Sequence, residues 1–305
     1  MLDVHQLRVL KEVARTGSYT AAASSLGYTQ PAVSYQMRRL QQAVGAPLVV
    51  KAGRALRLTE IGAVLVRHAD AVFSTLRAAD QEVALALARG SGLVRIAAFQ
   101  SSCVTLVPEL VARLRARHPE VRVTVVQAEP ADARRMVRSG EVDLGLLCNW
   151  EGDDLPEGEG AMLRTELMRD RRCVLMREDD PLAAQSTVDL IDLADYPWVM
   201  ETFRDRFLAA CATAGFQPSI VASVDDVSAI QALVASGLGV SLVSDMALHT
   251  HLASGLVRRP LRPWPLRHTY ALLWPDMAGV SAVQAALEET RAVARSFEQD
   301  GFPET

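Results

Sequence analysis

Residues 17–41 read GSYTAAASSLGYTQPAVSYQMRRLQ, and this stretch decides the fold of the N-terminal part. Gly17 and Gly27 stand where helices are expected to end, because glycine readily adopts the left-handed conformation that closes a helix. Ser18 and Thr29 follow these glycines and can cap the next helices. The pattern therefore predicts two consecutive helices separated by a tight turn, over residues 19–26 and from residue 29 onward.

The sequence on either side of this stretch completes a winged helix-turn-helix. Asp3 can cap a helix over residues 4–15. In the helix after Thr29, apolar residues recur at helical spacing and form a stripe expected to be buried: Val33, Met37, Leu40 and Val44. Pro31 is tolerated because it lies in the first turn of that helix. Two short strands that form a wing are predicted over residues 48–51 and 55–58.

The polar side of the third helix carries side chains that can read DNA. Gln30 is suited to bidentate contact with adenine, and Arg38 suits either a guanine edge or a phosphate. Arg54 in the wing is suited to the minor groove. The residues predicted to contact double-stranded DNA are Ser18, Thr29, Gln30, Pro31, Ser34, Tyr35, Arg38, Lys51 and Arg54. The alternative interpretation is an amphipathic helical unit whose polar face is only solvated.

Charge is divided unevenly along the 305 residues. Residues 1–67 contain nine Lys and Arg against three Asp and Glu, a net charge of +6. The whole chain has 32 basic and 36 acidic residues, so the remainder has 32 − 9 = 23 basic and 36 − 3 = 33 acidic residues, a net charge of −10. No carboxylate occurs between Val13 and Thr59. A short basic segment on an acidic body indicates that only this segment meets a polyanion.

A long helix is predicted after the wing. Thr59 can cap it, and it reaches about Ala88, before a hinge at Arg89-Gly90-Ser91-Gly92. Its apolar positions form one line together with His68: Ile61, Leu65, Val72, Leu76, Ala79, Val83 and Leu87. No neighbouring segment offers an adequate partner for so long a stripe. We therefore expect a second copy of the helix to cover it, which would make the protein a homo-oligomer.

From Leu93 the pattern changes to alternating strands and helices, which predicts an α/β domain with a largely parallel sheet. Strands are predicted over residues 93–98, 121–127, 142–147, 163–168, 173–177, 198–201, 219–223, 240–243 and 269–274. Helices are predicted over residues 103–117, 131–139, 204–214, 225–236 and 280–297. The chain is long enough for about two domains, each with its own core.

Ligands of open α/β sheets bind beyond the carboxyl ends of the strands, where helices begin. Applied to the predicted strands, this rule selects Gln100, Ser101, Ser102, Asn149, Glu201, Thr202, Phe203 and Asp225 as effector-contacting residues. Backbone N–H groups and hydroxyls at such positions suit an anion such as a carboxylate. The alternative is that the serines are ordinary helix caps. Cys103 adjoins this place, and an inert buried thiol is the favoured interpretation over a redox sensor.

Catalysis has little support in the sequence. The nucleophile-elbow, phosphate-loop, zinc-protease and dinucleotide-binding motifs are absent, so we expect neither an enzyme nor a bound cofactor. The four cysteines are scattered without metal-ligand spacing, and His249 and His251 would not share a helical face, so we expect no metal site.

No signal peptide or membrane-spanning stretch is visible, so a soluble cytoplasmic protein is expected. The alternative function is a small-molecule-binding protein or enzyme whose helical head serves only for dimerisation.

The chain resembles the LysR-type transcriptional regulators. The resemblance lies in five stretches: GSYTAAA at 17–23, LGYTQPAVS at 26–34, GRALRLT at 53–59, SGEVDLGL at 139–146 and ASGLGV at 235–240. It covers nearly the whole chain, and the N-terminal block is the most specific part. Val49, Ile61 and Ser244 depart from the residues usual in the family, and these departures affect packing or a turn rather than the fold.

The resemblance implies a winged helix-turn-helix over residues 1–58, a linker and dimerisation helix over 59–89, and an effector-binding domain over 90–305. That last domain would be similar to type 2 periplasmic binding proteins, with one lobe at 93–160 and 268–305 and another at 161–267. Such proteins assemble as dimers or tetramers and bind an interrupted inverted repeat. A small-molecule effector in the cleft between the lobes alters DNA bending and the recruitment of RNA polymerase, with no membrane involved.

Overall fold

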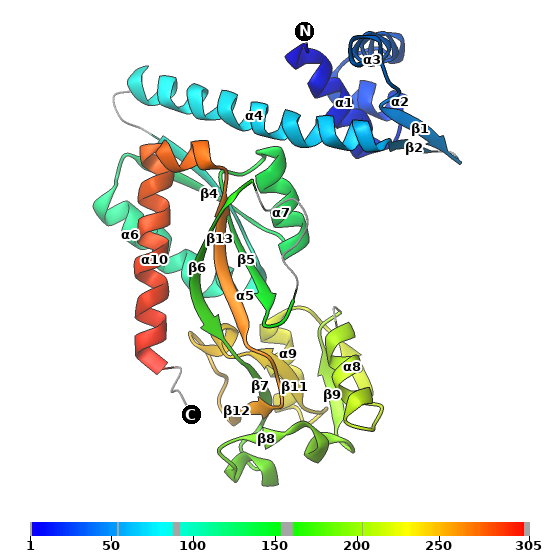
Figure 1. Cartoon of the computed structure of the whole chain (residues 1–305). Helices are drawn as coiled ribbons and strands as arrows, with labels where there is room; N and C mark the ends of the chain where they lie inside the picture. The colour runs from blue at the N-terminus through cyan, green and yellow to red at the C-terminus, as the bar shows by residue number, and fades with distance from the viewer. Residues whose placement is uncertain (1, 54, 88–91, 154–160, 203, 302–305) are drawn as a thin grey trace.

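The computed structural model describes residues 2–53, 55–87, 92–153, 161–202 and 204–301. The chain forms an N-terminal head, a long helix and an elongated α/β body made of two lobes (Figure 1). The head, residues 2–58, contains α1 (Val4–Thr16), α2 (Tyr19–Leu26), α3 (Gln30–Val44) and a wing of β1 (Val49–Ala52) and β2 (Ala55–Leu58). The winged helix-turn-helix expected from the sequence is confirmed.

Local capping explains why the head helices begin and end where they do. The side chains of Asp3, Ser18 and Thr29 each accept a hydrogen bond from a backbone N–H in the first turn of their helix. Gly17 and Gly27 close the preceding helices with φ of 64° and 69°, in the left-handed region that favours glycine. The three helices enclose a small core of Val9, Leu10, Val13, Ala22, Ala23, Val33, Met37, Leu40 and Leu48.

Helix α4 (Glu60–Leu87) joins the head to the body and contacts both. Leu7 of α1 packs with Ala69 and Phe73 of α4, which fixes the head on the first half of the long helix. Gly62 allows the close approach, because a Cβ at this position would lie 2.1 Å from the carbonyl oxygen of Leu48. Thr59, directly before the helix, accepts a hydrogen bond from the N–H of Gly62 at 3.0 Å.

The first lobe is built on a five-stranded sheet with the order β4-β3-β5-β13-β6. Its strands are β3 (Gly92–Ala98), β4 (Val121–Gln127), β5 (Leu144–Trp150), β6 (Leu163–Asp170) and β13 (Arg267–Leu273). The first three are parallel, and β13 is antiparallel to both of its neighbours. The sheet packs with α6 (Leu106–Arg117), α7 (Pro130–Ser139) and α10 (Ser281–Gly301), and the lobe also contains α5 (Gln100–Val104) and η4 (Pro275–Gly279).

Two expectations for the first lobe are corrected. A strand expected in the second lobe, β6, lies in the first sheet, because it pairs with β13 along its whole length. The helix expected over residues 103–117 is divided at Thr105 into α5 and α6. Pro108 explains the break, since its ring in one continuous helix would clash with the carbonyl of Val104 four residues earlier.

The second lobe contains a four-stranded sheet and a parallel strand pair. The sheet has the order β11-β7-β12-β8, formed by β7 (Arg172–Arg177), β8 (Val188–Asp189), β11 (Ser241–Ser244) and β12 (Leu256–Arg262). The pair consists of β9 (Pro197–Met200) and β10 (Ser219–Ser223). The lobe is completed by η1 (Pro181–Ala184), η2 (Leu190–Leu193), α8 (Asp205–Thr213), α9 (Val227–Ala235) and η3 (Met246–Leu248). Trp198 and Phe207 pack in its core with ring centroids 4.6 Å apart and ring planes tilted by 59°.

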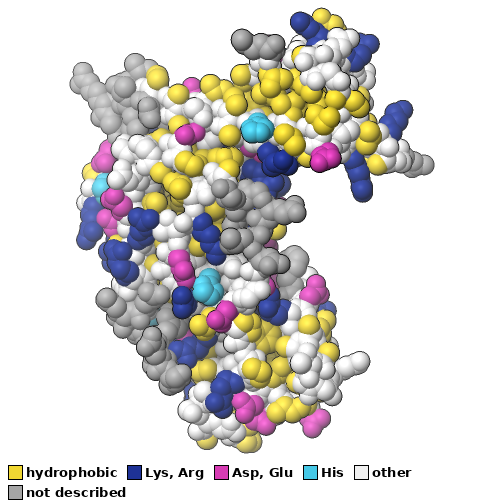
Figure 2. Space-filling model, viewed as in Figure 1, with side chains coloured by type: hydrophobic (Ala, Val, Ile, Leu, Met, Phe, Trp, Pro, Cys, Tyr) yellow, Lys and Arg dark blue, Asp and Glu magenta, His cyan; other side chains and the backbone are white. Residues whose placement is uncertain are grey.

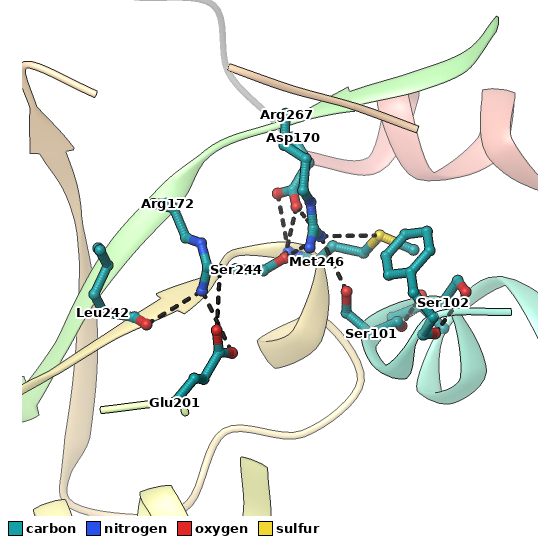
Figure 3. A network of polar contacts seen from close by, with 11 residues as sticks. Ser101, Ser102, Asp170, Arg172, Glu201, Leu242, Ser244, Met246 and Arg267 are labelled. Atoms are coloured by element: carbon teal, nitrogen blue, oxygen red, sulfur yellow. Dashed lines mark hydrogen bonds and ion pairs between the residues drawn. The ribbon is translucent and has the colours of Figure 1, made fainter. Parts of the chain in front are cut away.

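A buried ion pair lies where the chain crosses between the lobes (Figure 3). Arg267, at the start of β13, pairs with Asp170, at the end of β6, and both residues are at most 5% exposed. The Arg267 Nη2 also donates to the hydroxyls of Ser101 in the first lobe and Ser244 in the second. Asp170 accepts from the Ser244 hydroxyl at 2.6 Å and from the Met246 N–H at 3.2 Å. One buried charge pair thus connects both lobes.

We predict that Asp170→Ala lowers the free energy of unfolding by about 3–5 kcal/mol, because the buried Arg267 guanidinium loses its counter-charge. Chemical denaturation followed by tryptophan fluorescence measures the change. Arg115→Ala is the control, since Arg115 is exposed on α6 and has no ion pair among the described residues. A loss for Asp170→Ala no larger than that of the control would show that the pair does not stabilise the fold.

Candidate DNA-binding surface and interlobe cavity

Helix α3 separates its apolar residues from its polar ones as the sequence predicts. Val33, Met37 and Leu40 are at most 1% exposed and face the head core. Gln30 and Arg38 are exposed on the helix. A helix with one docked face and one exposed polar face meets the requirement for a recognition helix that enters the major groove.

Side chains outside the buried stripe of α3 interact with one another. The Gln30 amide donates to the hydroxyl of Ser34 at 2.8 Å, which presents both side chains on the same turn. Tyr35 is 51% exposed, and the guanidinium of Arg39 lies 5.9 Å from the centre of its ring. Pro31 is exposed in the first turn of α3.

The other predicted DNA-contacting residues lie at helix starts and in the wing. Ser18 and Thr29 are the caps of α2 and α3, so their hydroxyls are already used to begin the two helices. Lys51 is exposed on β1. Arg54, predicted to enter the minor groove, lies outside the described residues.

A cavity of about 540 Å³ lies between the two lobes. Five of the predicted effector-contacting residues line it: Gln100, Ser101, Asn149, Glu201 and Asp225. Of the other three, Ser102 and Thr202 are not among the lining residues, and Phe203 lies outside the described residues. Five of the eight residues that the rule selects therefore line this cavity.

Neighbouring serines of α5 have different surroundings. The Ser101 hydroxyl accepts a hydrogen bond from Arg267 and lines the cavity. Ser102 is fully buried, and its hydroxyl donates to the carbonyl of Phe99 at 2.7 Å, within its own helical turn (Figure 3). The helix turns the two side chains in different directions, which the sequence alone does not reveal.

Asp225 organises the side of the cavity that belongs to the second lobe. Its carboxylate accepts hydrogen bonds from the N–H of Thr202 at 2.7 Å and from the Thr202 hydroxyl at 2.9 Å. Its backbone carbonyl accepts from the side-chain amide of Gln100, which belongs to the first lobe. Thr202 therefore positions Asp225, and the Gln100 contact joins the two lobes across the cavity.

Charged groups of both signs line the cavity. Glu201 pairs with Arg172 at 3.1 Å, and the Arg172 guanidinium lies 5.3 Å from the centre of the Trp150 ring. Partial burial raises the pKa of Glu129, and the nearby carboxylates of Glu201 and Asp225 raise it further. Asn149 accepts a hydrogen bond from Arg164 at 2.7 Å.

Two arginines that sequence reasoning missed supply donors to this cavity. The Nε atoms of Arg172 and Arg267 are buried, and they have no hydrogen-bond acceptor in the part of the chain that the structure describes. Both residues line the cavity. Arg267 stands at the start of a strand rather than after one, so the rule that selected the other residues passes over it. A ligand oxygen is the group that would satisfy such N–H donors.

The cysteines favour the inert interpretation. Burial raises the pKa of the Cys103 thiol and that of Cys148, which opposes the lowering expected at a helix start. All four cysteines are free.

The ring of His249 packs on Phe297, with ring centroids 4.7 Å apart, and no cluster of His, Cys, Asp and Glu fit for a metal ion occurs among the described residues. Within the same ranges, no helix has the length and apolarity needed to cross a membrane.

Comparison with known proteins identifies the family. Residues 4–63 match the model of the bacterial regulatory helix-turn-helix protein, lysR family, and residues 88–295 match that of the LysR substrate binding domain. The chain belongs to the LysR family. It is a transcriptional regulator with a DNA-binding helix-turn-helix domain and an effector-binding domain.

Relatives and solved structures agree with this family. The small neutral protease regulatory protein of Streptomyces coelicolor is 30% identical over 300 residues, covering 95% of this chain and 91% of that protein. The regulator YvbU of Bacillus subtilis is 26% identical over 86% of this chain and 88% of its own length. A full-length OxyR variant from Pseudomonas aeruginosa has a similar fold, with a TM-score of 0.66, 24% identity and 97% coverage of both chains.

We predict that Arg38→Ala weakens binding to the preferred DNA sequence by about 1–3 kcal/mol and relaxes the preference at one base position, because a base-reading guanidinium is lost. Binding to a library of duplex variants at fixed salt measures both effects. Arg115→Ala, on the distant α6, should bind as the unchanged protein does. An equal loss on every sequence would instead assign Arg38 to a phosphate.

Proposed function

We propose that this regulator binds an interrupted inverted repeat near a promoter as a homodimer or homotetramer, and that a small molecule in the interlobe cavity changes the bending of the DNA. RNA polymerase would be the further partner, and the cytoplasm the place of action. In this proposal the chain regulates transcription and catalyses no reaction. The observation that carries the proposal is the exposed polar face of α3, opposite its buried stripe.

DNA contact in this proposal comes from the predicted residues of α3 together with the two capped helix starts and the wing. Gln30 and Arg38 would reach base edges, with the half-buried Ser34 and the exposed Tyr35 beside them on α3. Ser18, Thr29 and Pro31 lie at helix starts, where backbone N–H groups favour a phosphate. Lys51, and Arg54 beside it in sequence, would contact the flanking backbone and minor groove.

The exposed apolar face of α4 supports assembly through this helix. Ile61, Val64, Val72, Leu76 and Val83 are between 38% and 57% exposed. They recur at steps of three, eight, four and seven residues along a single helix, and Figure 2 shows apolar side chains along it. Leu65, another member of the predicted stripe, is half-buried because it packs toward the head core. A second copy of α4 is the partner that would cover such a face.

We predict that Leu76→Glu and Val83→Glu each shift the protein toward monomers, since a carboxylate would have to be buried in the helix pair. Sedimentation velocity at several concentrations measures the assembly. Ile191→Glu is the matched control, because Ile191 is 53% exposed on η2, far from α4 in the sequence and in the fold. An unchanged oligomer in both α4 variants would exclude this face as the interface.

The donors of the interlobe cavity support an effector that carries an anionic group. Arg172 and Arg267 each have a buried Nε without an acceptor among the described residues, and Ser101 lies at hydrogen-bond distance from Arg267. A carboxylate would accept hydrogen bonds from these groups. The carboxylates of Glu129, Glu201 and Asp225 would then face the remainder of the molecule, so an effector with a hydrogen-bond donor at its other end fits best.

Footprinting on the DNA upstream of the protein's own gene and the divergent neighbouring gene, with a panel of carboxylic acids added, tests the proposal. We expect protection of two half-sites and a changed protection pattern when an active acid is added.

We predict that Ser101→Ala reduces this response to the acid while operator binding is kept. Ser102→Ala should keep both, because the Ser102 hydroxyl does not reach the cavity. Equal responses of the two variants would remove Ser101 from the effector site. Binding that ignores salt would count against DNA recognition.

A further inference from the structure

A second cavity of about 540 Å³ lies at the junction of the head, α4 and the first lobe. Helices α1, α4 and α7 supply nearly all of its lining, which consists of Arg8, Lys11, Glu12, Ala14, Arg15, Val66, Asp70, Phe73, Arg77, Arg135, Arg138, Ser139 and Glu141. Figure 2 shows Lys and Arg side chains in the recess beneath α4. We call this space the junction cavity. It is separate from the interlobe cavity, since the two share no lining residue.

The junction cavity has an excess of positive charge. Its lining includes six basic and three acidic side chains, a net charge of +3. The three carboxylates each form an ion pair with one basic residue: Asp70 with Lys11 at 2.5 Å, Glu12 with Arg15, and Glu141 with Arg135 at 3.6 Å. Asp70 also interacts electrostatically, at longer range, with Arg77 and Arg138. Arg8, Arg77 and Arg138 remain without an ion pair in the described parts of the chain.

Two of these three arginines also have buried N–H groups with no acceptor. The Arg77 Nη2 and the Arg138 Nε are buried, and neither donates a hydrogen bond to any described residue. The Arg77 Nη1 reaches only a backbone carbonyl, that of Ser139, at 3.1 Å. Burial lowers the pKa of Arg77, and the neighbouring guanidinium of Arg95 lowers it further. Unsatisfied buried donors of a charged group are costly, so a missing acceptor is expected here.

The junction cavity is not a binding site for DNA. The basic residues of α1 contribute to the positive charge of the N-terminal segment, yet Arg8, Lys11 and Arg15 line a space that α7 of the body also encloses. A cavity of this volume admits a small molecule and excludes a duplex, whose major groove alone is about 12 Å wide. The occupant that balances three positive charges and accepts several hydrogen bonds is a small anion with more than one negative charge.

We propose that the junction cavity binds a small multivalent anion, whose phosphate or carboxylate oxygens accept hydrogen bonds from Arg77 and Arg138 and neutralise Arg8. Because the cavity is lined from both the head and the body, the bound anion stabilises the observed arrangement of these two parts. Its affinity is then coupled to that of any ligand that prefers the same arrangement. The anion is a second input to the protein, at a site separate from the interlobe cavity.

Isothermal titration calorimetry on the full chain without DNA tests the proposal, with pyrophosphate and citrate as probes. We expect saturable binding of at least one probe. Arg138→Gln and Arg8→Gln should each weaken it about tenfold, the effect of losing one charge-assisted contact. Arg8 is exposed on α1, so its replacement keeps the fold testable if Arg138→Gln does not fold. Binding of pyrophosphate alone identifies phosphate chemistry, and binding of citrate identifies polycarboxylates.

Two controls locate the anion. Arg115→Gln removes an exposed arginine of α6 and should leave the affinity unchanged. Arg172→Gln removes an arginine of the interlobe cavity and should also leave it unchanged, whereas loss of binding in this variant would move the anion to that cavity and overturn the proposal. No saturable binding of either probe, or unchanged binding in folded Arg8→Gln and Arg138→Gln, would overturn it as well. None of these results depends on recognition of an operator.

Discussion

The body depends on the buried pair of Arg267 and Asp170. Both residues sit at the two points where the chain passes between lobes, and their partners Ser101 and Ser244 come from opposite lobes. Removal of either charge would leave the other buried without compensation, which is among the most costly single changes in a protein interior. Arg267, Ser101 and Ser244 also line the interlobe cavity. A ligand that hydrogen-bonds to Arg267 would therefore act directly on the contact that holds the two lobes in their relative orientation.

The net charges of the N-terminal segment and of the body have opposite signs, but individual arginines are not distributed in the same way. The body is acidic overall, yet arginine N–H groups without acceptors among the described residues occur at the interlobe cavity, on Arg172 and Arg267, and at the junction cavity, on Arg77 and Arg138. Part of the positive charge counted in the N-terminal segment lies at the junction cavity rather than near α3. Net charge along the sequence therefore overstates the charge available for DNA and hides the charge available for small anions.

The helices of the head could be predicted from the sequence because the residues that begin and end each helix are adjacent to it. Asp3, Ser18 and Thr29 cap the helices that directly follow them, and Gly17 and Gly27 close helices through their own backbone conformation. Periodicity likewise gave α4 and most strands of the body. The exposed face of α3 follows from its buried one.

The features that sequence reasoning missed depend on distant partners. Strand β12 contains Arg258, Arg259 and Pro260, a poor strand pattern, and it is a strand because β7 pairs with it. Asp170 and Arg267 are separated by 97 positions, so no local pattern connects them. Ser101 and Ser102 are indistinguishable in the sequence, and only the rotation of α5, broken from α6 before Pro108, turns one toward the interlobe cavity.

The tight approach at Gly62 has a consequence for signal transmission. With the carbonyl of Leu48 against the start of α4, and with Leu7 packed on Ala69 and Phe73, the wing and the recognition helix are fastened to the long helix as a single stiff arm. A helix of 28 residues spans about 42 Å. A small tilt at the end of α4 nearest the lobes would thus become a displacement of several ångströms at the recognition helix, converting a change of angle into a change of position.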